Sequence, residues 1–260
     1  MKTDKVINHI VGWLLDYCEK AGVGGYVIGV SGGIDSAVTS TLCARTGKKV
    51  MVLNLPILQD PGQVSLAQSH IRWLTERFSN VASETIDLSG VFQVFARAIP
   101  DDTGDELTMA NTRSRLRMTA LYAMATHFKL LVAGTGNKVE DFGVGFFTKY
   151  GDGGVDISPI ADLMKTEVYE LARHMGILQK IIDVPPTDGL WTDSRTDESQ
   201  IGASYPELEW AMTADITTPE KEAALSDRQR EVLSIFRRFN RANRHKMEPI
   251  PVCRIPDNLR

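Results

Sequence analysis

The chain is expected to fold as an α/β protein: a doubly wound, Rossmann-like parallel sheet with helices on both faces. Short apolar runs alternate along its first half with segments whose apolar residues follow helical spacing. A glycine turn, residues 31–36 (SGGIDS), stands between one such run and the helical segment that follows. Ligands of doubly wound sheets bind at turns of this kind, beyond the carboxyl ends of the strands.

The first elements can be assigned in order. Helical spacing of apolar residues predicts an N-terminal helix over Val6–Tyr17, and an unbroken apolar run predicts the first strand over Tyr26–Val30. The segment after Ser36 is expected to be the next helix. Lys49–Leu55 reads as the second strand, and Pro56 ends it because proline has no amide hydrogen for a sheet ladder.

The remaining elements continue the alternation of helix and strand. They are a helix over Gln63–Phe78, a strand over Val81–Leu88, a helix over Ser89–Ile99, a turn over Pro100–Asp105, a helix over Leu107–Phe128 and a strand over Lys129–Gly134. We expect the strand order 3-2-1-4, which places the first and fourth strands side by side. The loops after these two strands would then meet at the point where ligands bind.

Bulk properties limit the function classes. With 260 residues, the chain is expected to be one domain over residues 1–260, with a helical and basic C-terminal tail from about residue 219. The net charge of −4 argues against nucleic-acid binding, and no early apolar run suits a signal peptide or membrane span. Cys18, Cys43 and Cys253 are scattered, which favours the reducing cytoplasm and no zinc site.

The glycine turn suits phosphate. Its two glycines let the backbone N–H groups point inward, and the following helix adds the positive end of its dipole. Ser31 and Ser36 offer hydroxyl donors. Asp35 would repel a phosphate unless a bound Mg²⁺ bridges the two. The turn lacks the Lys-Ser or Lys-Thr pair of a Walker loop, and a glycine turn that binds nothing is the alternative.

A second acidic residue follows the fourth predicted strand. Glu140 ends the segment that begins Gly134-Thr135-Gly136, so we expect its carboxylate to face Asp35. Two carboxylates suit Mg²⁺, with phosphates and waters completing its octahedron. Taken alone, a helix-capping role for Glu140 is the simpler interpretation.

Longer motifs then resemble known families. SGGIDS resembles the pyrophosphatase loop of ATP-dependent ligases that release AMP, and residues 146–154 (FFTKYGDGG) closely resemble the signature of NAD synthetase. Further similar stretches are Asn111–Met118, Pro186–Leu190 and Arg244–Lys246. Four departures from the family pattern stand out. The residues at Gly136–Val139 differ, the stretch between Glu140 and Phe146 is one residue longer, Ser114 replaces the usual alanine, and Pro186–Gly189 breaks the usual P-T-A-D-L sequence.

The resemblance implies an ammonia-dependent ligase of NAD biosynthesis. ATP would adenylate the nicotinate carboxylate of deamido-NAD⁺ and release pyrophosphate, and ammonia would then displace AMP. Asp35 and Lys165 are the implied catalytic residues, and Asp35 and Glu140 the implied Mg²⁺ ligands. The implied ATP contacts are Gly29, Val30, Ser31, Gly32, Gly33, Ile34, Asp35, Ser36, Thr135, Lys165 and Thr187. The implied deamido-NAD⁺ contacts are Arg115, Lys149, Asp156, His245 and Lys246.

The same resemblance implies a homodimer that acts on small molecules, without nucleic acid or membrane. We expect the Val6–Tyr17 and Leu107–Phe128 helices to supply its apolar surface, with Val6, Ile10, Trp13 and Leu14 on the first. Trp191–Ser204 is polar and is expected to be a mobile loop that closes over substrates. Two alternatives remain: another AMP-releasing ligase, such as a GMP-synthetase-like or tRNA-modifying enzyme, and an inactive nucleotide-binding regulator.

Overall fold

A parallel four-stranded sheet with the order β3-β2-β1-β4 organises the computed structural model, which describes residues 1–187, 189–190 and 195–260. The strands are β1 (Gly25–Gly29), β2 (Lys49–Asn54), β3 (Val81–Thr85) and β4 (Leu131–Val132). Pairing of β1 with both β2 and β4 is parallel. The predicted fold class and strand order are therefore confirmed.

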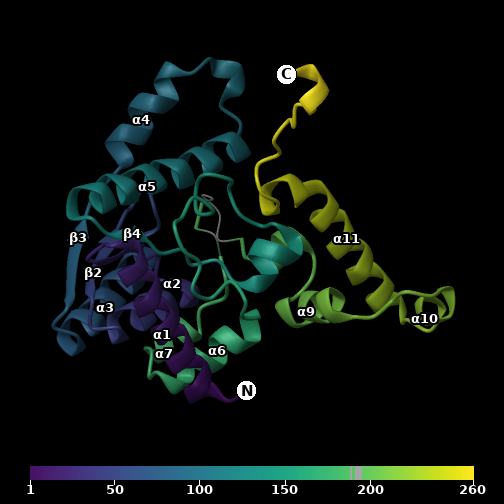
Figure 1. Ribbon diagram of the computed structural model, residues 1–260, viewed down its shortest axis with the longest axis horizontal. Helices are drawn as coiled ribbons and strands as arrows, with labels where there is room; N and C mark the ends of the chain where they lie inside the picture. The colour runs from purple at the N-terminus through teal and green to yellow at the C-terminus, as the bar shows by residue number, and fades with distance from the viewer. Residues whose placement is uncertain (188, 191–194) are drawn as a thin grey trace.

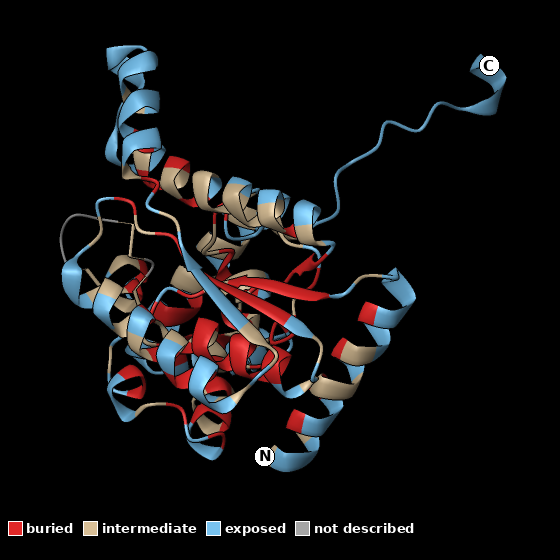
Figure 2. Cartoon of the chain, turned by 90° about the vertical axis from the view of Figure 1, so that its left-hand side faces the viewer, coloured by how far each residue is buried: buried red, intermediate tan, exposed pale blue. Residues whose placement is uncertain are grey.

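Helices cover both faces of the sheet because the strand side chains alternate between two cores. Tyr26 and Ile28 point into one core, with residues of α1, α2, α3 and α6, whereas Val27 and Leu53 point into the other, with α4 and α5. Figure 1 shows these layers, and Figure 2 shows buried strands (red) between them next to a mostly exposed strand (pale blue); β3 is the exposed one. The helices are α1 (Thr3–Ala21), α2 (Ile34–Arg45), α3 (Pro61–Arg77), α4 (Ser89–Ala98), α5 (Glu106–Phe128) and α6 (Lys165–His174).

The fourth strand is shorter than predicted. Lys129 ends α5 in the left-handed conformation, with φ of 54°, so it cannot begin a strand. Beyond β4, the Gly134 N–H donates to the Ile157 carbonyl at 2.7 Å, and Ala133 bridges to the same residue in parallel. The chain that follows the FFTKYGDGG motif therefore continues the sheet beyond β4.

A third apolar cluster lies beside the sheet and joins α8, α9, α11 and the π-helical turn η2. Val139, Tyr205, Leu208 and Val232 are among its buried members. The remaining elements are the short helices η1 (Asp101–Thr103) and η3 (Asp257–Leu259), together with η2 (Val139–Val144), α7 (Gln179–Ile182), α8 (Asp197–Ile201), α9 (Tyr205–Thr213), α10 (Pro219–Ala223) and α11 (Asp227–Met247).

The loop predicted over Trp191–Ser204 is corrected in part. Residues 197–201 form α8, which begins after Thr196 because its hydroxyl accepts the Ser199 N–H at 3.2 Å. Residues 188 and 191–194 lie outside the described residues. Among the helices that are described, none has the length and apolar character to cross a membrane.

Candidate functional site

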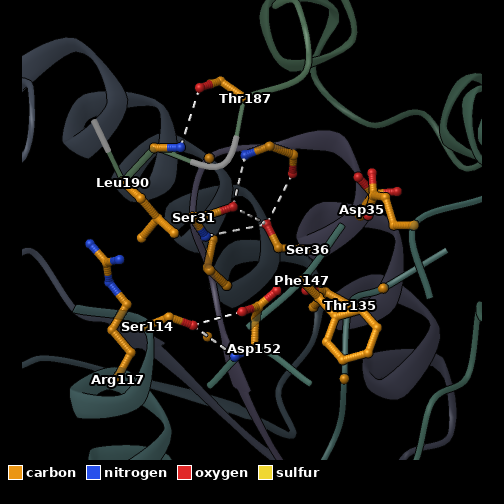
Figure 3. A pocket seen from close by; sticks show the side chains of 18 of the residues that line it. Ser31, Asp35, Ser36, Ser114, Arg117, Thr135, Phe147, Asp152, Thr187 and Leu190 are labelled. Atoms are coloured by element: carbon orange, nitrogen blue, oxygen red, sulfur yellow. Dashed lines mark hydrogen bonds between the residues drawn. The ribbon is translucent and has the colours of Figure 1, made fainter. Parts of the chain in front are cut away.

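The glycine turn after β1 holds its donors in a compact arrangement. Gly32 has a φ of +90°, and a side-chain carbon there would lie only 3.0 Å from backbone atoms of α3, so the position requires glycine. Ser31 Oγ lies 3.1 Å from Ser36 Oγ and accepts the Gly33 N–H at 3.2 Å. The N–H groups and hydroxyls thus face one another inside the turn (Figure 3), a donor set suited to phosphate oxygens.

The turn opens onto a cavity of about 260 Å³ at the carboxyl ends of the strands. The position is the one expected for a 3-2-1-4 sheet, between the loops that follow β1 and β4. Every residue that we assigned to ATP or to the metal lines this cavity: Gly29, Val30, Ser31, Gly32, Gly33, Ile34, Asp35, Ser36, Thr135, Glu140, Lys165 and Thr187.

A buried lysine joins the two predicted metal carboxylates. Lys165 Nζ lies 2.5 Å from Asp35 Oδ2 and 3.0 Å from Glu140 Oε1, and its side chain is 3% exposed. Burial alone would lower the pKa of Lys165, but attraction to Asp35 and Glu140 outweighs it and raises the pKa, so the ammonium stays charged. Lys165 thus sets the distance between the two loops.

The cluster is rich in carboxyl groups. Burial raises the pKa of Asp35, and nearby Glu140 raises it further against the pull of Lys165. Burial and the neighbouring carboxylates also raise the pKa of Asp141 to about 8. Asp141 packs so closely against Gly136 that a side chain there would collide with its carboxylate. The site therefore has a deficit of positive charge that a cation would relieve.

Asn137, in the stretch where the spelling departs from the family pattern, links the two loops. Its Nδ2 donates to Asp35 Oδ1 at 3.3 Å, while its Oδ1 accepts the Glu140 N–H at 3.2 Å. The following residues form the π-helical turn η2, in which one residue more than an α-helical turn is accommodated. The extra residue that we predict between Glu140 and Phe146 would fall within or next to this turn.

The donor set fits Mg²⁺ with substrate phosphates as its other ligands. Asp35 and Glu140 both contact one ammonium, so their carboxylates lie close enough to share an ion. Among the described residues, no group of three or more His, Cys, Asp or Glu side chains could hold a metal. Two carboxylates with phosphates and water are what Mg²⁺ usually takes, whereas a cage made only of protein ligands is not.

Sequence reasoning missed several residues of the site. Tyr205 is 3% exposed, and its hydroxyl lies 2.5 Å from Glu140 Oε1 and 3.1 Å from Asp197 Oδ2. Arg117 lines the cavity and donates from Nε to the Leu55 carbonyl at 3.0 Å. Asp197 lay in the segment predicted as a polar, mobile loop, and no sequence motif marked Tyr205.

Ser114 and Asp152 form a second missed pair on the cavity wall (Figure 3). Ser114 Oγ donates to Asp152 Oδ1 at 2.7 Å and accepts the Asp152 N–H at 2.8 Å. Asp152 is exposed within the cavity. The surrounding protein nevertheless raises the pKa of its carboxyl, against the hydrogen bonds from Ser114 and Thr148. Both residues stood within matched motifs, which was the available signal.

Four of the five residues assigned to deamido-NAD⁺ gather beside the cavity. Lys149 Nζ donates to the His245 carbonyl at 2.6 Å, Lys246 Nζ donates to the Phe147 carbonyl at 2.7 Å, and Arg115 Nε donates to the Lys149 carbonyl at 3.3 Å. None of the four lines the cavity itself.

Asp156, the fifth, lies apart from this group. Its carboxylate accepts the Val132 N–H at 2.8 Å and the Tyr122 hydroxyl at 3.0 Å. The structure thus places Asp156 at the edge of the sheet next to β4.

Comparisons with known proteins agree with the motifs. The family model described as NAD synthase matches residues 6–250. An NH₃-dependent NAD⁺ synthetase from Methanosarcina acetivorans is 38% identical over 97% of this chain and 98% of its own length.

Solved structures show the same architecture. The NMN synthetase of Francisella tularensis superimposes with a TM-score of 0.82 and 29% identity over 99% of both chains. The NH₃-dependent NAD synthetase of Campylobacter jejuni gives a TM-score of 0.79 over 98% of this chain and 100% of that one; at 24% identity it supports the fold alone.

Proposed function

The chain belongs to the NAD synthase family, and from this premise we propose that it is an ammonia-dependent NAD⁺ synthetase. The reaction joins ammonia to the nicotinate carboxylate of deamido-NAD⁺, with ATP converted to AMP and pyrophosphate. The enzyme is a ligase that forms a C–N bond in NAD biosynthesis. The match over nearly the whole chain to relatives of that name carries the proposal.

The chemistry explains why ATP is needed. Ammonia cannot displace oxide from a carboxylate, whereas AMP on an adenylated carboxylate is a good leaving group. The protein's contribution is to position the α-phosphate and to stabilise the charge that develops there. We assign this work to residues 29–36, Thr135, Lys165 and Thr187, because all of them line one cavity beside a turn of inward N–H and hydroxyl donors.

We assign Mg²⁺ to Asp35 and Glu140. When bound there with ATP, the ion would act as a Lewis acid that neutralises phosphate charge. Lys165 holds the two carboxylates at a fixed separation and offers its own charge to the same phosphates. The excess of carboxylates around one ammonium supports this assignment.

For deamido-NAD⁺ we keep Arg115, Lys149, His245 and Lys246, supported by their location in one group beside the cavity. Asp156 stays in the proposal through its motif position. We also propose that residues 1–260 act as one catalytic unit with a helical C-terminal tail from about residue 219. A reducing, cytoplasmic location is proposed from the three free cysteines.

We further propose a homodimer, with a revised surface. Ile10 and Leu14 cannot supply it, because both are buried in the core beneath α1. Trp13 and Tyr17 remain 39% and 40% exposed on the same helix, and Leu107 is exposed at the start of α5. Twofold dimers are the commonest assembly. Sedimentation of a fully active chain as a monomer at micromolar concentration would refute this proposal.

The similarity to an NMN synthetase structure suggests a second acceptor of ammonia. This acceptor is the mononucleotide that carries the same nicotinate carboxylate as deamido-NAD⁺. The TM-score of 0.82 over 99% of both chains favours testing the mononucleotide as an acceptor alongside the dinucleotide. In both cases the activated group is the nicotinate carboxylate, so the ATP end of the site would be unchanged.

The decisive experiment measures AMP, NAD⁺ and NMN formed from ATP, Mg²⁺ and ammonia with each acceptor in turn. We expect deamido-NAD⁺ to give the highest kcat/KM and NAD⁺ as product. A higher value with the mononucleotide would assign the second function. AMP formed only with other acceptors would indicate another ligase, and no AMP at all would indicate a regulator.

The nitrogen source is tested in the same assay. The rate with an ammonium salt should rise about tenfold per pH unit while ammonium predominates, because the nucleophile is NH₃. Glutamine should give no product, since Cys18 and Cys43 are buried and Cys253 lies exposed in the tail. NAD⁺ from glutamine free of ammonia would show an amidase activity instead.

A further inference from the structure

Tyr205 touches three charged groups of the site, although the proposed reaction gives it no task. It begins α9 and is almost fully buried. Its hydroxyl lies 2.5 Å from Glu140 Oε1 and 3.1 Å from Asp197 Oδ2. The Lys165 ammonium lies 4.6 Å from the centre of its ring. A buried tyrosine with these neighbours is more than apolar filling.

The contacts fix one oxygen of Glu140. Tyr205 and Lys165 both donate to Oε1, from different elements, so the carboxylate is held in one orientation. Its other oxygen, Oε2, is then the one that can reach a ligand in the cavity. A tyrosine hydroxyl carries its proton at neutral pH, and a carboxylate can only accept, so Tyr205 is the donor in this contact.

The single hydroxyl proton cannot serve both carboxylates at once. In the present arrangement Glu140 is the nearer acceptor, and Asp197 on α8 is the farther one. A positive charge on Glu140 weakens that oxygen as an acceptor, and the hydroxyl would then favour Asp197. The Tyr205 N–H also donates to Glu198 Oε1 at 2.8 Å, so α8 and α9 are already joined at this residue.

We propose that Tyr205 is a positioning residue that orients Glu140 toward a divalent cation and transmits the occupancy of that site to α8 through Asp197. The inference rests on the proposed function, because it takes the cation from that assignment. Tyr205 would be a hydrogen-bond partner of Glu140 that does not itself touch the cation. Removal of such a partner of a metal ligand typically lowers metal affinity by about 10–100-fold.

The first test measures metal binding without turnover. Mn²⁺ is titrated in the presence of an ATP analogue with a methylene bridge between the α- and β-phosphates, and free Mn²⁺ is followed by its paramagnetic resonance signal. Tyr205→Phe keeps the ring beneath Lys165 and removes only the hydroxyl. We expect its Mn²⁺ affinity to fall by about 10-fold or more.

Tyr122→Phe is the matched control. It also removes a hydroxyl that donates to a carboxylate, that of Asp156, away from the cavity. We expect wild-type Mn²⁺ affinity from it. In a Glu140→Gln background, Tyr205→Phe should change the remaining affinity by less than about twofold, because the two residues act through one contact. Wild-type affinity in folded Tyr205→Phe, or a full effect in that background, would overturn the proposal.

The second test follows α8 directly. Hydrogen exchange of the amides of residues 197–201 should slow when Mn²⁺ and the analogue bind to the wild type, and should not slow in Asp197→Asn. This variant leaves the Tyr205–Glu140 contact in place, and its hydrogen exchange is compared with that of the wild type at saturating Mn²⁺, so that a change in affinity does not affect the comparison. Asp197→Asn also keeps the proposal testable if Tyr205→Phe does not fold. Equal slowing in the wild type and Asp197→Asn would overturn the transmission to α8.

The two levels of the proposal fail separately. An enzyme that makes no NAD⁺ but shows hydroxyl-dependent Mn²⁺ binding would refute the proposed function and leave the role of Tyr205 intact. An active NAD⁺ synthetase whose Tyr205→Phe variant binds Mn²⁺ normally would refute only the role of Tyr205.

Discussion

The Lys165 ammonium nitrogen lies 2.5 Å from Asp35 Oδ2, and this ion pair joins two segments that are 130 residues apart in sequence. Because the Lys165 ammonium is buried and pairs with both Asp35 and Glu140, removing the ammonium would leave two carboxylates without a compensating charge. The second bond of Lys165, to Glu140, makes the ammonium a fixed spacer between the loops after β1 and β4. The relative position of these loops is therefore set before any substrate arrives.

Asp35→Asn and Glu140→Gln should each lower kcat by about 10²–10³-fold, as losses of charge stabilisation typically do. The fold should persist, because Lys165 keeps one carboxylate partner in either variant. Steady-state rates at limiting Mg²⁺, with circular dichroism for the fold, test this. Asp162→Asn is the control, since Asp162 pairs with Lys138 on the surface. A wild-type rate in Asp35→Asn or Glu140→Gln would refute the two-loop metal site.

Asn243→Ala should loosen the π-helical turn that carries Glu140. Asn243 Nδ2 donates to the Val144 carbonyl at 2.8 Å, and Asn240 Nδ2 donates to the Gly143 carbonyl at 2.7 Å. Loss of either donor leaves a partly buried carbonyl unsatisfied, which costs about 1–3 kcal/mol. We expect that loss in urea unfolding, together with a raised KM for MgATP.

Arg241→Ala, on the exposed side of α11, is the control for this prediction and should be neutral within about 0.5 kcal/mol. If Asn243→Ala unfolds at the wild-type urea concentration and keeps the wild-type KM, α11 does not support the turn.

The sheet could be predicted from the sequence because its signals are local. Apolar runs such as Tyr26–Val30 and Val50–Leu55 are mostly buried, and the glycine turn between the first run and α2 fixes where the ligand site must lie. The end of α5 was one exception, and the end of β3, at Thr85 and not at Leu88 as predicted, was another. A left-handed Lys129 is a matter of backbone conformation that a run of apolar residues does not reveal.

Of the charged residues around Lys165, only those that lie within recognisable sequence motifs could be predicted. Asp35, Glu140 and Lys165 lie within recognisable sequence motifs, so we could predict that they come together. Tyr205 contacts Glu140 although the two residues are 65 positions apart in sequence. Its helix has the ordinary spacing of apolar residues of a helix that packs through one face, so nothing in the sequence distinguishes Tyr205. A contact of this kind depends on how α9 packs against η2, and no local pattern of the sequence records that packing.

Ser114→Ala tests the hydrogen bonds that join α5 to the turn at Asp152. Ser114 Oγ makes two hydrogen bonds to Asp152 and fills the space beside Gly151. Alanine removes both bonds and leaves the Asp152 N–H without its acceptor, so the free energy of unfolding should fall by about 1–3 kcal/mol. Equilibrium urea unfolding measures the change.

Thr119→Ala, on the exposed face of the same helix, should leave this free energy within about 0.5 kcal/mol of wild type. A Ser114→Ala variant as stable as the wild type would mean that the turn at Asp152 is held by its other contacts, such as the Thr148 N–H bond at 2.9 Å.

His70 should make the protein lose stability in acid. It is fully buried between α2 and α3, where Nε2 lies 3.0 Å from Ser40 Oγ and the ring stacks on Trp73, itself covered by Arg77. Burial lowers the pKa of His70 to about 4, whereas an unfolded histidine titrates near pH 6.5. Between these values the unfolded chain binds more protons, so stability falls as the pH falls, by up to about 1.4 kcal/mol per pH unit.

Replacing the imidazole with a neutral amide isolates this contribution. In His70→Gln, the free energy of unfolding should decline less steeply than in the wild type between pH 6.5 and 4, where His70 titrates, even if the variant is less stable at pH 7 through poorer packing. His9→Gln, at an exposed position of α1, should keep the wild-type slope. The comparison is the difference in slope between each variant and the wild type, because carboxylates contribute equally to all three. Parallel curves for His70→Gln and the wild type would show that His70 becomes protonated without unfolding, and thus that the space between α2 and α3 admits the charge.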